Sequence, residues 1–161
     1  GLENTLMLLA SRLKPTISRP EIKLVKAYES LPQVDCYASQ LNQVFMNILV
    51  NAIDCIDEAH EHSEGSEQPT PHQIVLQTYS KDQRVVIQIT NSGPPIPQDI
   101  AQRMFDPFFT TKSVGKGTGM GLAISYQTIA DLHKGTLEYR QTLDGRTAFV
   151  IEIPTVQVAE I

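Results

Sequence analysis

Residues 115–122 are Gly-Lys-Gly-Thr-Gly-Met-Gly-Leu, and an amphipathic helix is expected to begin where this glycine-rich run ends. Glycines let the backbone approach an anion without a Cβ in the way. The helix that follows offers unpaired N–H groups and the positive end of its dipole to a phosphate. Taken alone, the run is equally consistent with a tight loop. It matches neither the Walker A motif nor the dinucleotide-binding fingerprint, because their lysine and acidic partners are absent at the required spacings.

Two asparagines, Asn47 and Asn51, lie earlier in the chain on a helix expected from about Ala38 to Ala59. An apolar stripe predicts this helix, and it consists of Leu41, Val44, Phe45, Ile48, Leu49, Ala52 and Ile56. Carboxamides one helical turn apart can hold a hard cation through their oxygens. Alone they are also consistent with ordinary polar helix residues. Together with the glycine run they predict a site for a magnesium-bound nucleoside triphosphate.

Length and composition limit the classes of protein to consider. The 161 residues suit one domain, with 41% hydrophobic and 19% charged residues. No apolar run approaches the roughly 20 residues that span a bilayer, and no signal peptide is visible. The net charge of −5 argues against nucleic acid as a partner. Two cysteines, Cys36 and Cys55, suggest reduced, buried thiols of a cytoplasmic domain. Because the chain begins at Gly1 rather than Met, the parent protein is expected to be longer, and either soluble or membrane-anchored.

The remaining patterns predict the other elements. Helices are expected at 2–13, 97–104 and 122–132, and strands at 22–28, 74–79, 84–90, 136–140 and 147–153. The polar, proline-containing stretch 60–72 predicts a surface loop or a disordered segment. Strands paired mainly by hairpins, with helices grouped between them, predict an α/β (α+β) two-layer sandwich. Its sheet is expected to be mixed, mostly antiparallel and covered on one face by helices.

A loop with unusual aromatic content precedes the glycine run. Residues 105–112 are Phe-Asp-Pro-Phe-Phe-Thr-Thr-Lys. Three aromatics in a loop indicate either anchors that hold a mobile flap to the core or plain local packing. Lys112 is placed to reach a terminal phosphate as a point charge, although a solvated surface lysine is the alternative.

In combination, these segments resemble the catalytic ATP-binding domain of bacterial two-component sensor histidine kinases. That domain belongs to a superfamily shared with gyrase, heat-shock chaperone and mismatch-repair ATPases. Residues 43–52 match the family's N box, 91–93 stand at its first glycine box, 105–112 at its F box, and 117–122 match its second glycine box. Residues 133–135, 145–149 and 153–154 resemble its C-terminal hairpin. The resemblance implies an ATP-binding domain over 1–154 with an ATP lid, followed by a tail at 155–161.

The resemblance also implies roles for single residues. Asn51 is expected to bind Mg²⁺, while Asn47 and Lys112 are the candidate catalytic residues near the phosphates. The expected nucleotide contacts are Asn47, Asn51, Asp54, Asn91, Gly93, Ile96, Phe105, Lys112, Gly117, Thr118, Gly119, Met120, Gly121, Leu122 and Thr147. The lid between Gly93 and Thr118 is expected to close over ATP, held by Phe105, Phe108 and Phe109. His133 stands at a structural position without a catalytic role.

Two departures from the family pattern affect the expected base site. The first glycine box is usually Asp-x-Gly-x-Gly, whose Asp accepts a hydrogen bond from the adenine amino group. Here Asn91 replaces the Asp and Pro95 replaces the second glycine. A carboxamide oxygen still accepts such a bond, without charge assistance, and Pro94-Pro95 stiffens the lid arm. We therefore expect adenine selectivity to be retained with weakened affinity.

The resemblance favours a kinase over a hydrolase. Related hydrolases carry a Glu one helical turn before the metal-binding Asn, where Asn47 stands here and provides no base. Phosphoryl transfer depends mainly on positioning and charge neutralisation. None of the four histidines has the context of a phosphoacceptor, although His60-Glu61 is superficially similar. The phosphoacceptor histidine is expected on dimerisation helices upstream of this chain. A response-regulator receiver domain is the other expected partner.

Two alternatives remain open at this stage. Asn91 and Pro95 suggest a degenerate nucleotide-binding module that regulates a partner without transferring phosphate. A serine kinase of the same superfamily is the other, although Phe-Phe-Thr-Thr-Lys at 108–112 and Gly-Thr-Gly-Met-Gly-Leu at 117–122 favour the histidine kinases.

Overall fold

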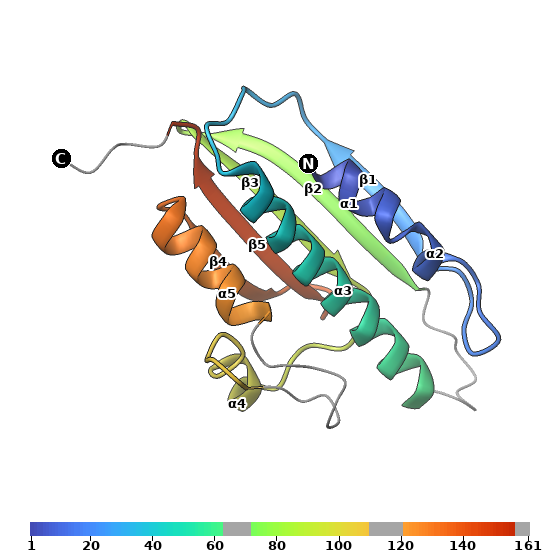
Figure 1. Ribbon diagram of the computed structural model, residues 1–161. Coiled ribbons are helices and arrows are strands. Elements are labelled where there is room, and N and C mark those ends of the chain that lie inside the picture. The colour runs from blue at the N-terminus through green and yellow to red at the C-terminus, as the bar shows by residue number, and fades with distance from the viewer. Residues whose placement is uncertain (63–71, 110–120, 157–161) are drawn as a thin grey trace.

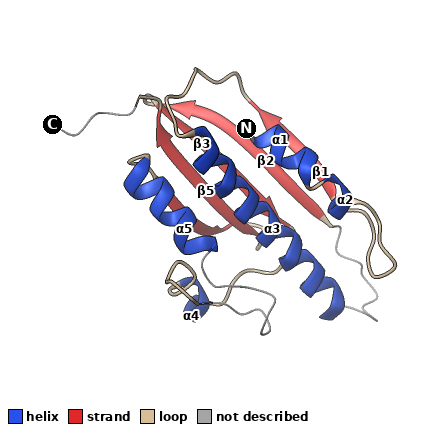
Figure 2. Cartoon of the chain, viewed as in Figure 1, coloured by secondary structure: helices blue, strands red, loops and turns tan. Residues whose placement is uncertain are grey.

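A five-stranded sheet with helices on one of its faces forms the two layers of the molecule (Figures 1 and 2). The structure is a computed structural model that describes residues 1–62, 72–109 and 121–156. The strands are β1 (Lys23–Tyr28), β2 (Gln73–Lys81), β3 (Arg84–Asn91), β4 (Thr136–Gln141) and β5 (Thr147–Pro154). The helices are α1 (Leu2–Leu8), α2 (Ala10–Leu13), α3 (Ala38–His62), α4 (Gln98–Ala101) and α5 (Gly121–Gln127), and α5 runs into one π-helical turn, η1 (Thr128–Leu132).

The strand order is β1-β2-β3-β5-β4. β1 runs parallel to β2, and the three other pairs are antiparallel. The predicted fold class, a mixed and mostly antiparallel sheet beneath helices, is confirmed. The β2–β3 turn places Asp82 and Gln83 at φ of 52° and 62°. Positive φ values at both central residues are typical of a two-residue hairpin turn, because the twist of such a turn matches the twist of the two strands it joins.

α3 lies across the middle of the sheet and supplies the centre of the core (Figure 1). Its apolar stripe recurs every three or four residues, so one flank of the helix is buried while the other carries polar side chains. Fully burying one such aliphatic side chain stabilises the fold by about 1.5–3 kcal/mol. The largest fully buried side chains on α3 and on the facing strands are Ile48, Leu49, Ile53, Ile56, Ile74, Leu76, Ile89, Phe149, Ile151 and Ile153.

Two predicted helices are interrupted. The helix expected over 2–13 breaks at Leu9, which has φ −97° and ψ 2° and separates α1 from α2. The helix expected over 122–132 changes from α5 to the π-helical turn η1. Here the backbone N–H of His133 bonds to the carbonyl of Thr128 at 3.2 Å, and the Nδ1 of His133 lies 2.9 Å from the same oxygen. The buried His133 ring therefore stabilises a wider turn that periodicity alone does not predict.

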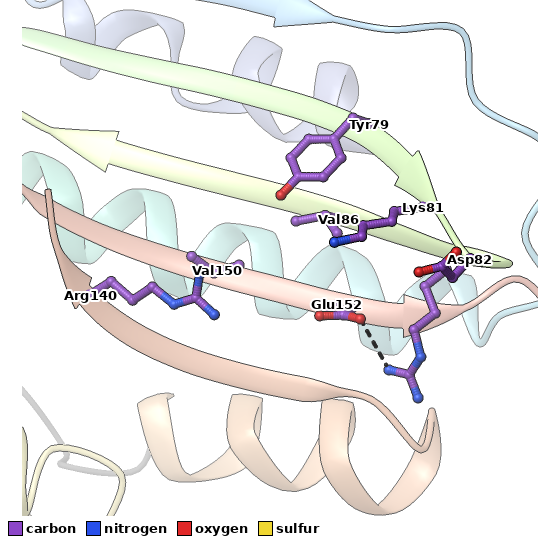
Figure 3. Close-up of a pocket in the computed structure, with 8 residues that line it drawn as sticks. Tyr79, Lys81, Asp82, Val86, Arg140, Val150 and Glu152 are labelled. Atoms are coloured by element: carbon purple, nitrogen blue, oxygen red, sulfur yellow. Dashed lines mark ion pairs between the residues drawn. The ribbon is translucent and has the colours of Figure 1, made fainter.

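The sheet face opposite the helices carries a shallow, polar hollow (Figure 3). Its volume is about 420 Å³, and an Arg84–Glu152 ion pair of 3.5 Å crosses it. The residues that line it are Tyr79, Lys81, Asp82, Arg84, Val86, Arg140, Val150 and Glu152. This hollow contains none of the residues singled out from the sequence, so the candidate site lies elsewhere. Within the described ranges, no helix is both long and apolar enough to cross a bilayer.

Candidate functional site

The junction between α3 and the start of α5 brings the two decisive sequence segments together. The Nδ2 of Asn47 donates to the carbonyl oxygen of Gly121 and to the Oγ of Ser125, at 3.1 Å each. Its Oδ1 accepts a hydrogen bond from the Nε2 of Gln43 at 3.0 Å. The asparagine-bearing helix therefore holds the residue at which the glycine run ends. The expectation that these separated segments converge is borne out at Asn47 and Gly121.

Ser125 is a part of this junction that sequence reasoning missed. Its side chain is completely buried, and its Oγ donates to the carbonyl oxygen of Gly121 at 2.8 Å. The signal was present in the sequence, because Ser125 lies one helical turn after Gly121, among apolar helix positions. A buried hydroxyl in such a place requires a polar partner, and Asn47 provides it.

Asn51 lies one helical turn beyond Asn47 on α3 and differs from it in its surroundings. It is half-buried and has no hydrogen-bond partner among the described residues. Its carboxamide oxygen therefore remains available to a hard cation, which prefers oxygen ligands. The assignment of Asn51 to magnesium stays a prediction that this chemistry fits.

Asp54 faces a different neighbour from the one the resemblance implies. Its carboxylate accepts from the Nη2 of Arg12 at 2.9 Å, and Arg12 also reaches Asp57 at 3.3 Å. Asp57 in turn pairs with the buried Arg19. These ion pairs tie α3 to α2 and to the segment before β1. The nucleotide contact of Asp54 stays a prediction, and the structure gives this carboxylate an ion-pair partner instead.

The turn after β3 packs directly on α3. Asn91 is 1% exposed, and its Oδ1 accepts from the backbone N–H of Gly93 at 2.9 Å. A Cβ on Gly93 would lie 2.7 Å from the Sγ of Cys55, so only glycine fits there. Burial, followed by the nearby carboxylates of Glu58 and Asp54, raises the pKa of Cys55 to about 11. The thiol is therefore neutral at physiological pH.

Thr147, at the start of β5, closes the other side of this turn. Its side chain is buried, and its Oγ1 donates to the carbonyl oxygen of Pro94 at 2.8 Å. Ile96 is fixed as well, because its backbone N–H donates to the hydroxyl of Tyr139 at 2.9 Å. Segments from α3, β3 and β5 thus meet around Asn91, and the nucleotide contacts of Asn91 and Thr147 stay predictions.

The aromatic loop is anchored by two of its three phenylalanines. Phe105 packs against the core and lies 5.4 Å from Tyr126, measured between ring centroids. The guanidinium of Arg103 lies 4.7 Å from the ring centroid of Phe109. Phe108, in contrast, is 76% exposed and has a φ of 66°. The prediction that Phe108 anchors the loop to the core is therefore wrong, because its ring is largely exposed.

Several predicted contacts lie outside the described residues. These are Lys112, Gly117, Thr118, Gly119 and Met120. Their roles stay predictions. Leu122, the next predicted contact, is half-buried and packs against the core.

His133 has the structural role expected for it. Its ring is completely buried, its Nε2 accepts from the backbone N–H of Tyr37 at 3.0 Å, and its Nδ1 bonds to Thr128. Since Nε2 accepts, the proton lies on Nδ1 and the imidazole is neutral. Both nitrogens are used, and none remains for chemistry.

Comparison with known proteins places this fold and site in an ATPase family. The family model described as "Histidine kinase-, DNA gyrase B-, and HSP90-like ATPase" matches residues 36–157, and the chain belongs to this family. Among its relatives, Sporulation kinase E of Bacillus subtilis (strain 168) is 33% identical over 133 residues, which are 82% of this chain and 16% of that protein. The sensory histidine kinase/phosphatase NtrB of Rhizobium leguminosarum bv. phaseoli is 29% identical over 145 residues, 87% of this chain and 37% of that protein.

Solved structures agree with this assignment. The catalytic domain of the histidine kinase ThkA, in a nucleotide-free form, superimposes with a TM-score of 0.75 at 25% identity, covering 97% of this chain and 92% of that one. The resemblance to histidine kinase catalytic domains is thus confirmed in sequence and in fold. The chain spans well under half the length of the curated relatives named above.

Proposed function

We propose that this chain binds Mg-ATP and donates the γ-phosphate to a histidine on a separate dimerisation domain, in two-component signal transduction. The observation that carries the proposal is the bond from Asn47 to Gly121 and Ser125, because it sets the N-terminal end of α5 beside the helix that bears Asn51. A helix N-terminus favours phosphate and a carboxamide oxygen suits magnesium. The two elements required for a metal-bound triphosphate therefore lie at one junction.

Magnesium, when bound, neutralises charge on the phosphate oxygens. Asn51 is the residue that would hold it, because its carboxamide has no other partner among the described residues. Asn47 has a different task. Its amide nitrogen and oxygen are both engaged within the protein, so it positions α5 and offers no base to activate water. This favours transfer to a good nucleophile, such as a neutral imidazole, over hydrolysis.

The partners follow from the family. ThkA has been solved in complex with the response regulator protein TrrA, and 39% of that chain matches the fold of this one, with a TM-score of 0.73 at 24% identity. We propose the equivalent partners here: upstream dimerisation and phosphoacceptor helices of the same protein, and a receiver domain. The location that fits these partners is the cytoplasm.

Calorimetric titration of ATP, with and without magnesium, tests the nucleotide site. The wild type is expected to bind ATP with an affinity that magnesium increases, and Asn51→Ala is expected to lose that increase. Asn42→Ala, on the same helix, is the matched control and should behave as the wild type does. Magnesium enhancement that survives in Asn51→Ala would contradict the metal assignment, and absence of ATP binding in the wild type would contradict the function.

The transferred phosphate distinguishes the remaining alternatives. The full-length parent protein, incubated with Mg-ATP, is expected to carry an acid-labile phosphate, as phosphohistidine does. An acid-stable product would indicate a serine kinase. No product, with ATP binding intact, would indicate a regulatory module that only senses nucleotide.

A further inference from the structure

An acidic side chain lies on the flank of α3 that carries the candidate nucleotide residues. Asp54 follows Asn51 by three positions and Asn47 by seven, so the three side chains share one flank of the helix. Side chains three or four positions apart on a helix have their Cβ atoms about 5–6 Å from each other. The side chain of Asp54 is also 25% exposed, so part of it is open to solvent. Resting on the proposed function, its carboxylate is a negative charge beside the site of a triphosphate.

A cation from another element balances this charge. The Nη2 of Arg12, on α2, lies 2.9 Å from the Oδ1 of Asp54 and 3.3 Å from the Oδ2 of Asp57. Asp57 has a second cationic partner in the buried Arg19. Since Arg19 balances Asp57, the positive charge of Arg12 serves mainly Asp54, which it reaches from 42 positions away in the chain.

The sign of the charge beside the phosphates decides what this ion pair does. ATP keeps a net negative charge even with one magnesium ion bound, so a carboxylate next to it is repulsive on balance. At about 0.1 M salt the screening length is roughly 10 Å, which is longer than the spacing between Asn51 and Asp54 along α3. The charge of Asp54 therefore acts on the ligand, and the guanidinium of Arg12 offsets it.

We propose that Arg12 tunes the nucleotide site by neutralising Asp54, so that the affinity for ATP follows the net charge of the Arg12–Asp54 pair. Arg12 is a positioning residue in this role, because it acts through Asp54 and needs no contact with the nucleotide. The role differs from the direct nucleotide contact that the resemblance implies for Asp54. It also makes α2, which precedes β1, part of a site otherwise built from α3, α5 and the turn after β3.

Calorimetric titration of ATP in excess magnesium tests the pair in the wild type, two single variants and the double variant. The wild-type pair is neutral, Arg12→Gln leaves it negative, Asp54→Asn leaves it positive, and the double variant makes it neutral again. We expect Arg12→Gln to weaken ATP binding by about three- to tenfold, the effect of one unit charge at this distance. Asp54→Asn should bind ATP at least as tightly as the wild type does. The double variant should return to within about twofold of the wild type, because its pair carries no net charge.

Arg140→Gln is the matched control. Arg140 pairs with Glu138 at 2.8 Å on β4 and lines the hollow on the opposite face of the sheet. The control removes the same unit of charge from the molecule as Arg12→Gln does, and its ATP affinity should stay within about twofold of the wild type. Repeating the titrations at about 0.5 M salt should bring the ratio of Arg12→Gln to wild-type dissociation constants toward one, because salt screens charges. A loss caused by damaged packing of α2 would persist at high salt.

The outcomes separate this inference from the function on which it rests. If the wild type binds no ATP, the proposed function fails and the role of Arg12 falls with it. If the wild type binds ATP and Arg12→Gln binds it equally well or more tightly, the function stands and the role of Arg12 is overturned. A double variant that stays as weak as Arg12→Gln overturns it as well. Should Arg12→Gln fail to fold, Asp54→Asn decides, because weaker ATP binding than in the wild type contradicts the proposal.

Discussion

Two asparagines of the same helix have opposite surroundings. Asn47 makes two hydrogen bonds that join α3 to α5 and a third to Gln43 within α3, whereas Asn51 has no partner among the described residues. An unmade hydrogen bond between partly buried groups costs about 1–3 kcal/mol, while removal of an unpaired polar group costs little. Asn47 should therefore stabilise the fold, whereas Asn51 should remain available to the ligand.

We predict that Asn47→Ala lowers the free energy of unfolding by about 1–3 kcal/mol, and that Asn51→Ala changes it by less than about 0.5 kcal/mol. Urea unfolding without nucleotide measures both. Asn51→Ala is the internal control, because it removes the same group from the same helix. Equal losses in the two variants would show that the bonds of Asn47 carry no stability.

At the scale of elements, the end of α3 is joined to the start of β2 by two histidines. The Nε2 of His72 lies 2.9 Å from the Nδ1 of His60. Burial, and then the proximity of His60 and Arg19, lowers the pKa of His72 below its ordinary value of 6.5, although Asp57 opposes the shift. The folded state thus prefers the neutral imidazole. The unfolded chain binds the proton first as the pH falls, so acid favours unfolding.

The predicted consequence is a stability that is fully present above pH 6.5 and declines as the pH falls below it. The urea midpoint of the wild type should fall between about pH 7 and about pH 5, the range in which histidine titrates. His72→Gln, which does not titrate, should show a shallower decline. Parallel curves for the two proteins would mean that other groups control this range.

Next to the β4–β5 pair, the backbone of Gly135 lies close to that of Glu152. A Cβ on Gly135 would lie 2.1 Å from the carbonyl oxygen of Glu152, which cannot move without disturbing the ladder. We predict that Gly135→Ala lowers the free energy of unfolding by more than about 3 kcal/mol.

Gly145, in the turn between the same strands, supplies the control. It has a φ of +83° and open space around its Cβ position. Gly145→Ala should therefore cost only the backbone strain, about 1–2 kcal/mol. Chemical denaturation of both variants measures the difference, and a Gly135→Ala variant as stable as Gly145→Ala would contradict the steric argument.

Elements whose pattern is local were predictable from the sequence. The apolar stripe of α3 and the turn around Asp144-Gly145 each depend on a few neighbouring residues, and both occur where expected. The π-helical turn was not predictable from periodicity, because the His133 ring that bonds to Thr128 is buried and also accepts a bond from Tyr37, a residue 96 positions away.

The candidate site shows the same difference between residues that a local motif reveals and contacts that depend on the fold. Asn47 and Gly121 were recognised as motif residues, and the structure joins them. The Asp54–Arg12 ion pair and the exposure of Phe108 were missed. The first joins α2 to α3 across 42 positions of the chain, and the second accompanies a positive φ angle. Neither could be predicted from the residue type. An acid on a helix can face a ligand or an arginine, and an aromatic in a loop can be buried or exposed.

At the scale of the whole molecule, sheet order brings the site together. β3 and β5 are neighbours in the sheet although far apart in the chain, so Asn91 and Thr147 become cross-strand partners. α3 and α5 lie over the same face of the sheet (Figure 1), and the bond from Asn47 to Gly121 joins them there. The hollow at Arg84 and Glu152 lies on the opposite face of the sheet. The candidate nucleotide site therefore belongs to the helix-covered side.

The histidines of the molecule bear on where the phosphate goes. His133 is completely buried with both nitrogens hydrogen-bonded, and His60 and His72 are bonded to each other. A phosphoacceptor needs a free imidazole nitrogen in line with the γ-phosphate, within about 3–3.5 Å of it. Both nitrogens of His133 are occupied, and the mutual bond of His60 and His72 occupies one nitrogen of each ring. These bonds support the proposal that the acceptor histidine lies on another domain.

We therefore predict that this chain alone, incubated with Mg-ATP, gains no acid-labile phosphate even while it binds the nucleotide. Radiolabelled ATP followed by alkaline and acid treatment measures phosphohistidine, and calorimetry on the same preparation shows that the site is occupied. Adding the dimerisation helices of the parent protein should then produce the phosphorylated histidine on those helices. Phosphate on His60 of the isolated chain would contradict this division of labour, because it would place donor and acceptor in one domain.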